Sequence, residues 1–317
     1  MKTLAVVLGT LLFVCAGTFI LMNNRQERNE LTDEVRSAAP GKFIDLSQGR
    51  VHYALEGPEK SEVIIFIHGG GVTGMEVWRR NLPYFVHKGY RVLAYDLYGR
   101  GFTDRPKIEH APEVFSAQLA ELIDSLDLQP PFHLVSMSMG AIIALDYASV
   151  HPENVSKLVV IDPAISGEFR TNPLLKLPVV SDVLLTCYWY PRAVKNQRKE
   201  FADKALFESY AERLRYFMAF KGYKHANRST WKNMLTQNRI DKMNALPLSH
   251  MLLIYGDEDP YFRDAQCRKL QSKLPGLETI KIEWAGHMPH LEKPLEVNHA
   301  IHSFFRGVDG FRFSMYQ

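Results

Sequence analysis

Short apolar runs alternate with helical patterns over most of the chain. The run from Val63 to Ile67 contains no polar position, as a strand buried on both faces of a sheet requires. Comparable strand patterns occupy residues 91–95, 132–135, 157–161, 251–255 and 277–284. Helical patterns between or after them occupy residues 76–88, 112–126, 139–150, 265–274 and 295–305. This alternation predicts an α/β fold with a mostly parallel, doubly wound sheet and right-handed crossovers.

Two parts of the chain depart from this alternation. Residues 43–46 and 50–56 predict a hairpin with Gly49 in its turn, which brings the sheet to about eight strands. Residues 164–244 contain no clear strand pattern, only helical and proline-interrupted segments. We therefore expect a helical cap after the sixth strand, inserted into a core of residues 43–163 and 245–317. Such an insertion can cover the carboxyl ends of the strands, where open α/β sheets bind ligands.

The N-terminal segment has a different pattern. Thr3 to Met22 carry no charge, and about 20 apolar residues are enough for a helix to cross a bilayer. We expect a transmembrane signal-anchor in residues 1–24 and a polar linker in residues 25–42. A cleavable signal peptide is the alternative, because Val14-Cys15-Ala16 offers small residues for processing. The apolar pattern continues beyond this site, which favours an uncleaved anchor.

The flanking charges do not decide on which side of the membrane the body of the protein lies. Arg25, Arg28 and Arg36 follow the apolar segment, whereas only Lys2 precedes it. By the positive-inside tendency, this distribution places the body of the protein in the cytoplasm. Export is the opposing expectation for an N-terminal segment that looks like a signal.

The composition narrows the possible partners. A chain of 317 residues with 46% hydrophobic content can bury a large core, so one main domain with an insertion is expected. The net charge is only +3 and no basic stripe with interleaved aromatic residues is present, so nucleic acid is not an expected partner. Cys187 and Cys267 lack metal or redox spacing, and we expect both to be small buried residues. A disulfide between them is the lesser alternative.

A candidate nucleophile lies between a strand pattern and a helical pattern. Ser136 to Gly140 occupy the position of a nucleophile elbow, in which Ser138 would point its hydroxyl over the carboxyl edge of the sheet. The flanking residues of such a turn must be small. Gly140 meets this need, but Ser136 stands where the first glycine of G-x-S-x-G is usual. The pentapeptide alone is a weak signal, so the rest of the site has to support it.

Candidate acids and a candidate base follow later strands. A serine hydroxyl is a weak nucleophile and needs a base together with an acid that orients the base. Asp257, Glu258 and Asp259 follow the seventh predicted strand, and His287 follows the last one. The chain order is therefore Ser, Asp, His, and each group lies at the carboxyl end of a strand. Chemistry and spacing alone do not choose among the three acidic residues.

A glycine-rich turn supplies the remaining element of such a site. His68-Gly69-Gly70-Gly71 follows the third predicted strand, and its backbone can approach a ligand closely. We expect the N–H groups of Gly70 and Met139 to form an oxyanion hole, because Met139 directly follows the candidate nucleophile. Each such donor contributes about 3 to 4 kcal/mol to stabilising the transition state.

Together these motifs resemble the α/β-hydrolase family over residues 43–306. The stretches that carry the resemblance are Phe66–Gly70, Tyr95–Gly101, Ser136–Gly140, Gly256–Pro260 and Gly286–Pro294. The resemblance implies that the acid is Asp259, the last residue of the G-x-x-D turn, and that the base is His287. It also implies structural roles for Asp96 and Arg100. Asp162, after the sixth strand, is the reserve candidate for the acid.

The resemblance also separates the chain from neighbouring groups. Haloalkane dehalogenases and epoxide hydrolases have an aspartate at the elbow, where this chain has Ser138. Prolyl iminopeptidases usually have a proline in the His-Gly-Gly turn, which is absent here. Carbon-carbon hydrolases of ring-cleavage (meta-cleavage) products usually have a tryptophan where Leu291 stands. They are therefore the second choice.

The cap suggests the class of substrate. Its apolar and aromatic residues between Leu174 and Tyr190 are either its own core or the lining of a hydrophobic site. With a membrane anchor, they favour a serine esterase or lipase that cleaves carboxylic esters of hydrophobic or lipid-like substrates through an acyl-enzyme. Such chemistry needs no metal and no organic cofactor. An acyltransferase with the same triad and a non-catalytic ligand-binding protein of the same fold are further alternatives.

Overall fold

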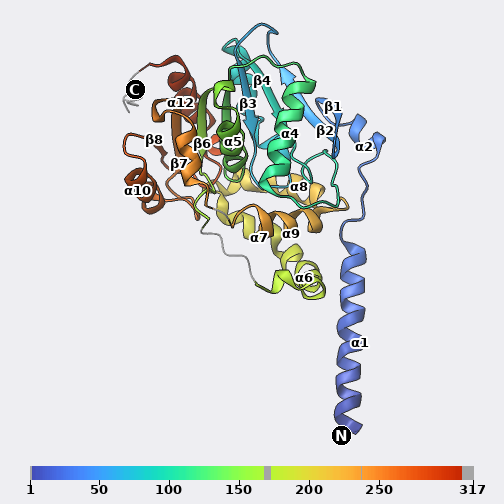
Figure 1. Cartoon of the computed structure of the whole chain (residues 1–317). Coiled ribbons are helices and arrows are strands. Elements are labelled where there is room, and N and C mark those ends of the chain that lie inside the picture. The colour runs from blue at the N-terminus through green and yellow to red at the C-terminus, as the bar shows by residue number, and fades with distance from the viewer. Residues whose placement is uncertain (1, 168–172, 237, 309–317) are drawn as a thin grey trace.

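The computed structural model describes residues 2–167, 173–236 and 238–308. Its centre is an eight-stranded sheet with the order β1-β2-β4-β3-β5-β6-β7-β8 (Figure 1). The strands are β1 Lys42–Leu46, β2 Gly49–Glu56, β3 Val63–Ile67, β4 Arg91–Tyr95, β5 Phe132–Met137, β6 Val155–Ile161, β7 Met251–Gly256 and β8 Glu278–Ile282. Strand β2 pairs antiparallel with β1 and β4, and all other pairs are parallel. The predicted mostly parallel sheet is confirmed.

Helices cover both faces of this sheet. One hydrophobic core packs the sheet against α4 Pro112–Ser125, α5 Gly140–Val150 and α10 Asp264–Lys273. The other core packs it against α3 Leu82–His87 and α12 Pro294–Arg306. Strands β3 and β5, at the centre of the sheet, have every residue buried. This is why the sequence shows β3 as a continuous apolar run and β5 as a mostly apolar one.

Two predicted elements differ from the structure. The helix expected at residues 76–88 is split into a 3-10 turn, η1 Gly74–Trp78, and helix α3. Pro83 lies in the first turn of α3, where a missing N–H costs no hydrogen bond, so the helix starts anew there. The last strand ends at Ile282, before Trp284, whose φ of 56° is incompatible with an extended strand.

The segment between β6 and β7 is a helical cap, as predicted. Its elements are η3 Pro173–Lys176, α6 Pro178–Leu184, the π-helical turn η4 Leu185–Trp189, α7 Tyr190–Gln197, η5 Arg198–Glu200, α8 Lys204–Met218, α9 Tyr223–Asn233, η6 Ile240–Ala245 and η7 Leu248–His250. Figure 1 shows α7, α8 and α9 lying along one edge of the sheet. Helix α8 buries Phe207, Tyr210, Leu214 and Phe217. The cap therefore has a core of its own that is continuous with one face of the sheet.

The N-terminal residues form helix α1, Lys2–Arg25, which extends away from the rest of the protein (Figure 1). None of the described helices is both long enough and apolar enough to cross a membrane. The following residues, predicted as a linker, contain the short helix α2 Asp33–Ser37 and contact the cap. Gln26 Nε2 donates to the carbonyl of Thr186 at 2.9 Å, and Asn29 forms a β-bridge with Phe220.

The three cysteines are free thiols. Cys267 is buried, as expected, and burial raises the pKa of its thiol. Cys187 is only half-buried, so the prediction that it is a buried residue is wrong. It lies in the π-helical turn η4, and this helical turn presents one side to solvent.

Candidate active site

Ser138 lies in the turn between β5 and α5, and its φ is 48°. A non-glycine residue with positive φ is strained, and a nucleophile elbow requires this conformation. The Ser138 N–H donates to the carbonyl of Ile161 at 2.8 Å, which ties the turn to β6. At Gly140 a β-carbon would lie 2.5 Å from the carbonyl oxygen of Ile67 and 2.7 Å from that of His68. The turn therefore accepts only glycine at that position.

Ser136, the irregular first position of the motif, is compatible with the turn. It is fully buried at the end of β5, and its hydroxyl donates to the carbonyl of Val159 at 3.1 Å. A buried hydroxyl is costly only when it has no partner. The carbonyl on the neighbouring strand β6 supplies this partner.

Three predicted residues meet in one hydrogen-bonded chain. Ser138 Oγ lies 2.9 Å from Nε2 of His287, and Nδ1 of His287 lies 2.7 Å from Oδ2 of Asp259. Both distances are within the range of good hydrogen bonds. Because Nδ1 donates to the carboxylate, Nε2 is free to accept the serine proton. The structure therefore brings together the residues that the sequence predicted as nucleophile, base and acid, and their catalytic roles stay a prediction.

Geometry selects Asp259 among the three acidic residues that follow β7. Its Oδ1 accepts the N–H of Tyr261 at 2.7 Å, which orients the carboxylate while Oδ2 faces His287. The Asp257 carboxylate instead accepts the N–H of Ala285 at 3.3 Å. The backbone N–H of Glu258 donates a hydrogen bond to the Ala285 carbonyl at 2.9 Å. Both residues hold the turn that carries the histidine.

The surrounding charges adjust the protonation of the base and the acid. Burial disfavours a charged imidazole, but the carboxylates of Asp259, Glu200 and Glu292 outweigh it and raise the pKa of His287. Burial alone would raise the pKa of the Asp259 carboxyl. The charge of His287 and its hydrogen bond outweigh this effect, so the pKa is lowered. The pair therefore favours an ionised acid beside a base that is readily protonated.

A second carboxyl group, from Asp162, lies beside the acid. Asp162 follows β6, has φ 43° and is almost fully buried. Its Oδ1 accepts the N–H of Gly256 at 3.2 Å, and its buried Oδ2 receives no donor from the described residues. Burial and the Asp259 charge raise the pKa of Asp162 well above its usual value. Asp162 was the reserve candidate for the acid; the residue in contact with His287 is Asp259.

One potential metal-ligand group exists in the described parts of the chain. Oxygen or nitrogen atoms of Asp162, Asp259 and His287 lie within 4.8 Å of one another. Both ring nitrogens of His287 already contact Asp259 and Ser138. Hydrogen bonding within the site accounts for this clustering.

The glycine-rich turn lies beside Ser138. The backbone N–H groups of Gly70 and Met139 donate to no backbone carbonyl within the described residues. Met139 is the N-cap of α5, so its N–H also benefits from the positive end of the helix. Arg100 Nε donates to the Gly70 carbonyl at 2.8 Å and fixes the orientation of that peptide. The oxyanion hole that the sequence predicted from these two N–H groups stays a prediction.

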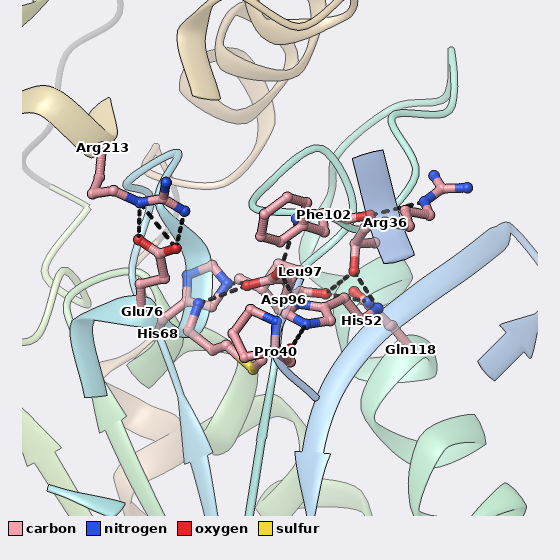
Figure 2. A network of polar contacts seen from close by, with 12 residues as sticks. Arg36, Pro40, His52, His68, Glu76, Asp96, Leu97, Phe102, Gln118 and Arg213 are labelled. Carbon is pink, nitrogen blue, oxygen red and sulfur yellow. Dashed lines mark hydrogen bonds and ion pairs between the residues drawn. The ribbon is translucent and has the colours of Figure 1, made fainter. Parts of the chain in front are cut away.

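A buried polar network holds the turn from outside the site (Figure 2). The Asp96 carboxylate accepts the N–H groups of Met75 at 2.6 Å and Phe102 at 2.9 Å, and contacts Nδ1 of His52 at 2.7 Å. His68 joins the same network, since its Nε2 accepts the N–H of Leu97 at 3.0 Å. Burial lowers the pKa of His68 to about 4, so its ring is neutral. The structural role expected for Asp96 agrees with these contacts.

The other histidine near the base is not part of the hydrogen-bonded chain. His290 is fully buried against Trp78, with 4.3 Å between the ring centroids. Burial lowers its pKa to about 3. Its ring nitrogens have no partner among the described residues, so this ring serves as packing.

A cavity of about 750 Å³ opens between the cap and the carboxyl ends of the strands. Ser138 and His287 lie in its wall. Most of the cap residues in the wall are apolar or aromatic, among them Leu175, Leu185, Trp189, Leu214, Trp231 and Leu235. Such a cavity suits a substrate with a substantial apolar part.

Two polar residues of this wall were not found from the sequence. Tyr261 packs edge-on against the His287 ring, with 5.1 Å between centroids, and its hydroxyl donates to Glu200 Oε1 at 3.0 Å. The Glu200 carbonyl accepts the N–H of His287 at 2.7 Å. Glu200 comes from the cap and Tyr261 from the loop after Asp259. No motif marks either position.

The comparisons with known proteins agree with this architecture. The family described as "Alpha/beta hydrolase family" matches residues 64–300, most of the chain. The protein belongs to the alpha/beta hydrolase family. The resemblance inferred from the motifs is therefore confirmed for the family.

Curated relatives of this hydrolase have several activities in their names. A non-heme chloroperoxidase of Streptomyces lividans is 30% identical over 125 residues, 39% of this chain and 45% of the relative. A 2-hydroxy-6-oxo-6-phenylhexa-2,4-dienoate hydrolase of Comamonas testosteroni is 32% identical over 133 residues, 41% of this chain and 46% of the relative. A 2-hydroxy-6-oxononadienedioate/2-hydroxy-6-oxononatrienedioate hydrolase of a Pseudomonas species is 26% identical over 285 residues, 85% of this chain and 98% of the relative. The matched part spans about half the length of the first two relatives.

Solved structures show the same fold at low identity. An enol-lactonase of Burkholderia xenovorans LB400 has a TM-score of 0.70 at 17% identity, with 84% of this chain and 100% of that chain covered. A meta-cleavage product hydrolase of Pseudomonas fluorescens IP01 has a TM-score of 0.68 at 21% identity, with 85% and 98% covered. An esterase of Exiguobacterium antarcticum has a TM-score of 0.68 at 18% identity, with 84% and 99% covered. These similarities concern the fold alone.

Proposed function

We propose that this α/β-hydrolase is a serine hydrolase that cleaves a bond next to the carbonyl carbon of a largely apolar substrate. The observation that carries the proposal is the continuous contact from Ser138 Oγ through His287 to Asp259, at 2.9 and 2.7 Å. The contact connects a strained nucleophile in the cavity wall to a base and to an acid that orients the base.

The proposed reaction has two steps. His287 removes the proton of Ser138 as the oxygen attacks the carbonyl carbon, while Asp259 holds the imidazole in the required tautomer. The N–H groups of Gly70 and Met139 stabilise the oxyanion. His287 then protonates the leaving group, and an acyl-enzyme remains. Water activated by His287 releases the acid and restores Ser138.

A carboxylic ester is the first candidate substrate. Most of the cap residues in the wall are apolar or aromatic, and the end of the cavity near His287 carries the acidic groups Glu200 and Asp162. No arginine lines the cavity within the described ranges. This wall suits an uncharged ester with an apolar acyl chain, because an anionic group near the histidine would face acidic side chains.

Hydrolysis of a carbon-carbon bond is the second candidate, and the relatives favour it. Several of them are named as hydrolases of 2-hydroxy-6-oxo dienoates or dienedioates, one of which spans 85% of this chain. Leu291, the residue that argued against this activity, is fully buried and does not line the cavity. Its identity therefore says little about the substrate. The anionic end of such a substrate would have Lys199 and Lys224 as its cationic neighbours in the described wall.

Labelling with a fluorophosphonate probe tests the shared mechanism. We expect the purified protein to be labelled and the Ser138→Ala variant to remain unlabelled; equal labelling of both would exclude the serine nucleophile. A screen of p-nitrophenyl esters of increasing chain length, with a meta-cleavage dienoate alongside, then distinguishes ester hydrolysis from carbon-carbon bond hydrolysis. Activity on the dienoate alone would reject the ester. Predominant transfer to an added alcohol would instead identify an acyltransferase.

The location of the protein is a separate proposal. We propose that residues 1–24 attach the protein to a membrane, with export after cleavage as the alternative. Large apolar side chains of α1 are exposed and no part of the described body covers them, namely Val7, Phe13, Val14, Ile20 and Leu21. Exposed apolar side chains in series favour contact with an apolar environment. No described helix meets the length and apolarity needed to cross a bilayer, so this proposal rests on the sequence pattern.

Fractionation of the full-length protein tests this attachment. An anchor in residues 1–24 requires that the protein stay in the membrane fraction after sodium carbonate extraction and be released by detergent. A variant that lacks residues 1–24 should be released without detergent. Mass spectrometry of the N-terminus separates the anchor from a cleaved signal peptide. Release of the full-length protein by carbonate would contradict an anchor.

A further inference from the structure

Polar side chains gather at the end of the cavity that contains the base. Glu200 ends η5, Tyr261 follows Asp259, and both line the cavity together with His287. The Tyr261 hydroxyl donates to Glu200 Oε1 at 3.0 Å, and its ring lies edge-on to the imidazole. The Glu200 backbone carbonyl accepts the His287 N–H at 2.7 Å. Glu200 is thus held next to His287 by two hydrogen bonds, one to its side chain and one to its backbone carbonyl.

A second polar pair continues this cluster. The Tyr210 hydroxyl accepts a hydrogen bond from Nε2 of Gln197 at 3.0 Å and contacts Oγ1 of Thr73 at 3.3 Å. Tyr210 and Gln197 line the same cavity, and Gln197 lies one turn of the cap away from Glu200. Burial raises the pKa of Tyr210 beyond the physiological range, so its hydroxyl stays protonated. This end of the cavity therefore offers hydrogen-bond donors and acceptors, whereas the remaining cap wall is mainly apolar.

The mechanism determines which part of a substrate occupies the polar end. In acyl transfer the imidazole gives its proton to the leaving group, so the leaving group must lie next to His287. In an ester the leaving group is the alcohol. The acyl chain lies on the other side of the carbonyl carbon, away from the leaving group. The alcohol part is thus the part that meets Glu200 and Tyr261.

The chemistry of Glu200 restricts this alcohol further. A partly buried carboxylate is stabilised by hydrogen-bond donors and destabilised by other anions. Burial raises the pKa of the Glu200 carboxyl, although His287 and the hydrogen bond from Tyr261 act in the opposite direction. Free hydroxyl groups are suitable donors. A phosphate on the alcohol would instead be repelled, although Lys199 lies 5.4 Å above the Tyr261 ring.

We infer that Glu200, Tyr261 and the Gln197–Tyr210 pair form a subsite for an alcohol that carries further uncharged hydroxyl groups. The substrate class is then an ester of a polyol, such as glycerol, with one apolar acyl chain. This inference rests on the proposed serine-hydrolase function. In the reaction the ester C–O bond breaks, the acyl–Oγ bond of Ser138 forms, and the alcohol oxygen receives the proton from His287.

Two esters of the same acid provide the test. Monobutyrylglycerol and ethyl butyrate share the acyl group and differ in the alcohol, which carries free hydroxyl groups only in the glycerol ester. We expect kcat/KM of the wild type to be about tenfold higher for the glycerol ester, because a polar site discriminates against a substrate that leaves it unpaired. Glu200→Gln and Tyr261→Phe should remove most of this preference, mainly by lowering kcat/KM for the glycerol ester.

Glu208→Gln is the matched control, since Glu208 is an exposed residue of α8 paired with Arg198 at 3.7 Å and lies outside the cavity. It should keep the wild-type preference. Equal wild-type kcat/KM for the two esters would overturn the subsite, and so would an equal loss on both esters in Glu200→Gln. Absence of hydrolysis of either ester, with no labelling of Ser138, would overturn the serine-hydrolase function itself and the subsite with it.

Discussion

A carboxyl oxygen of Asp162 lies within 4.8 Å of a carboxyl oxygen of Asp259, and both side chains are almost completely buried. Two ionised carboxylates this close inside a protein repel each other strongly. Because the pKa of Asp162 is raised and that of Asp259 is lowered, a protonated Asp162 beside an ionised Asp259 is favoured. We therefore expect Asp162 to hold a proton that it can donate towards Asp259.

Substitutions of Asp162 test this arrangement. Asp162→Asn keeps a neutral donor, so we expect kcat/KM to remain within about threefold of wild type. Asp162→Leu removes the donor and should lower kcat/KM by about tenfold or more. In the leucine variant Asp259 becomes a stronger acceptor, so the acid limb of the pH profile of kcat/KM should move to higher pH. A shift of that limb to lower pH in Asp162→Asn would show that Asp162 is ionised.

The same proton affects stability. In the unfolded chain Asp162 ionises with the usual carboxyl pKa of 3.8, whereas the folded protein raises this pKa. Folding therefore gains from the neutral group below pH 3.8 and loses that gain as the pH rises towards the folded-state pKa. Asp162→Asn does not titrate, so its Tm should increase relative to wild type over this range. Parallel Tm curves for the two proteins across the range would contradict a protonated Asp162.

The charges around His287 should shift the acid limb of the pH profile of kcat/KM. The general base must be neutral, so kcat/KM falls when the pH drops below its pKa in the free enzyme. Because Asp259, Glu200 and Glu292 raise this pKa against the effect of burial, the acid limb should lie above the usual histidine value of 6.5. Glu200→Gln removes one of these charges and should move the limb to lower pH with ethyl butyrate as the substrate. An unmoved limb would mean that Glu200 does not act on His287.

The sequence was enough to predict which residues meet in the proposed catalytic chain, for a physical reason. Ser138, Asp259 and His287 each follow a strand of the parallel sheet, and the topology brings strand ends together at one edge. Glu200 comes from the cap, whose packing no short motif encodes. Ser136 also needed the structure, because its partner, the carbonyl of Val159, belongs to a neighbouring strand.

This partner leads to a prediction for the irregular elbow position. Ser136→Gly restores the usual motif but removes the hydroxyl donor to Val159 and adds backbone freedom in β5. We expect stability to fall by about 1 kcal/mol, while labelling of Ser138 by a fluorophosphonate persists. Chemical denaturation and the labelling rate would be measured together. Loss of labelling at full stability would mean that the serine side chain itself shapes the nucleophile.

Two glycines near Ser138 provide a matched pair for the elbow itself. At Gly140 an added β-carbon would lie 2.5 Å from the Ile67 carbonyl oxygen, a backbone atom that cannot move aside without shifting β3. At Gly70 the nearest atom would be Sδ of Met139 at 3.8 Å, an ordinary contact. Gly140→Ala should therefore cost about 2 to 4 kcal/mol of stability and most of the activity, whereas Gly70→Ala should cost less than about 1 kcal/mol. Denaturation midpoints and fluorophosphonate labelling would measure both effects. Similar stability of the two variants would show that β3 and the elbow are not as tightly packed as these distances require.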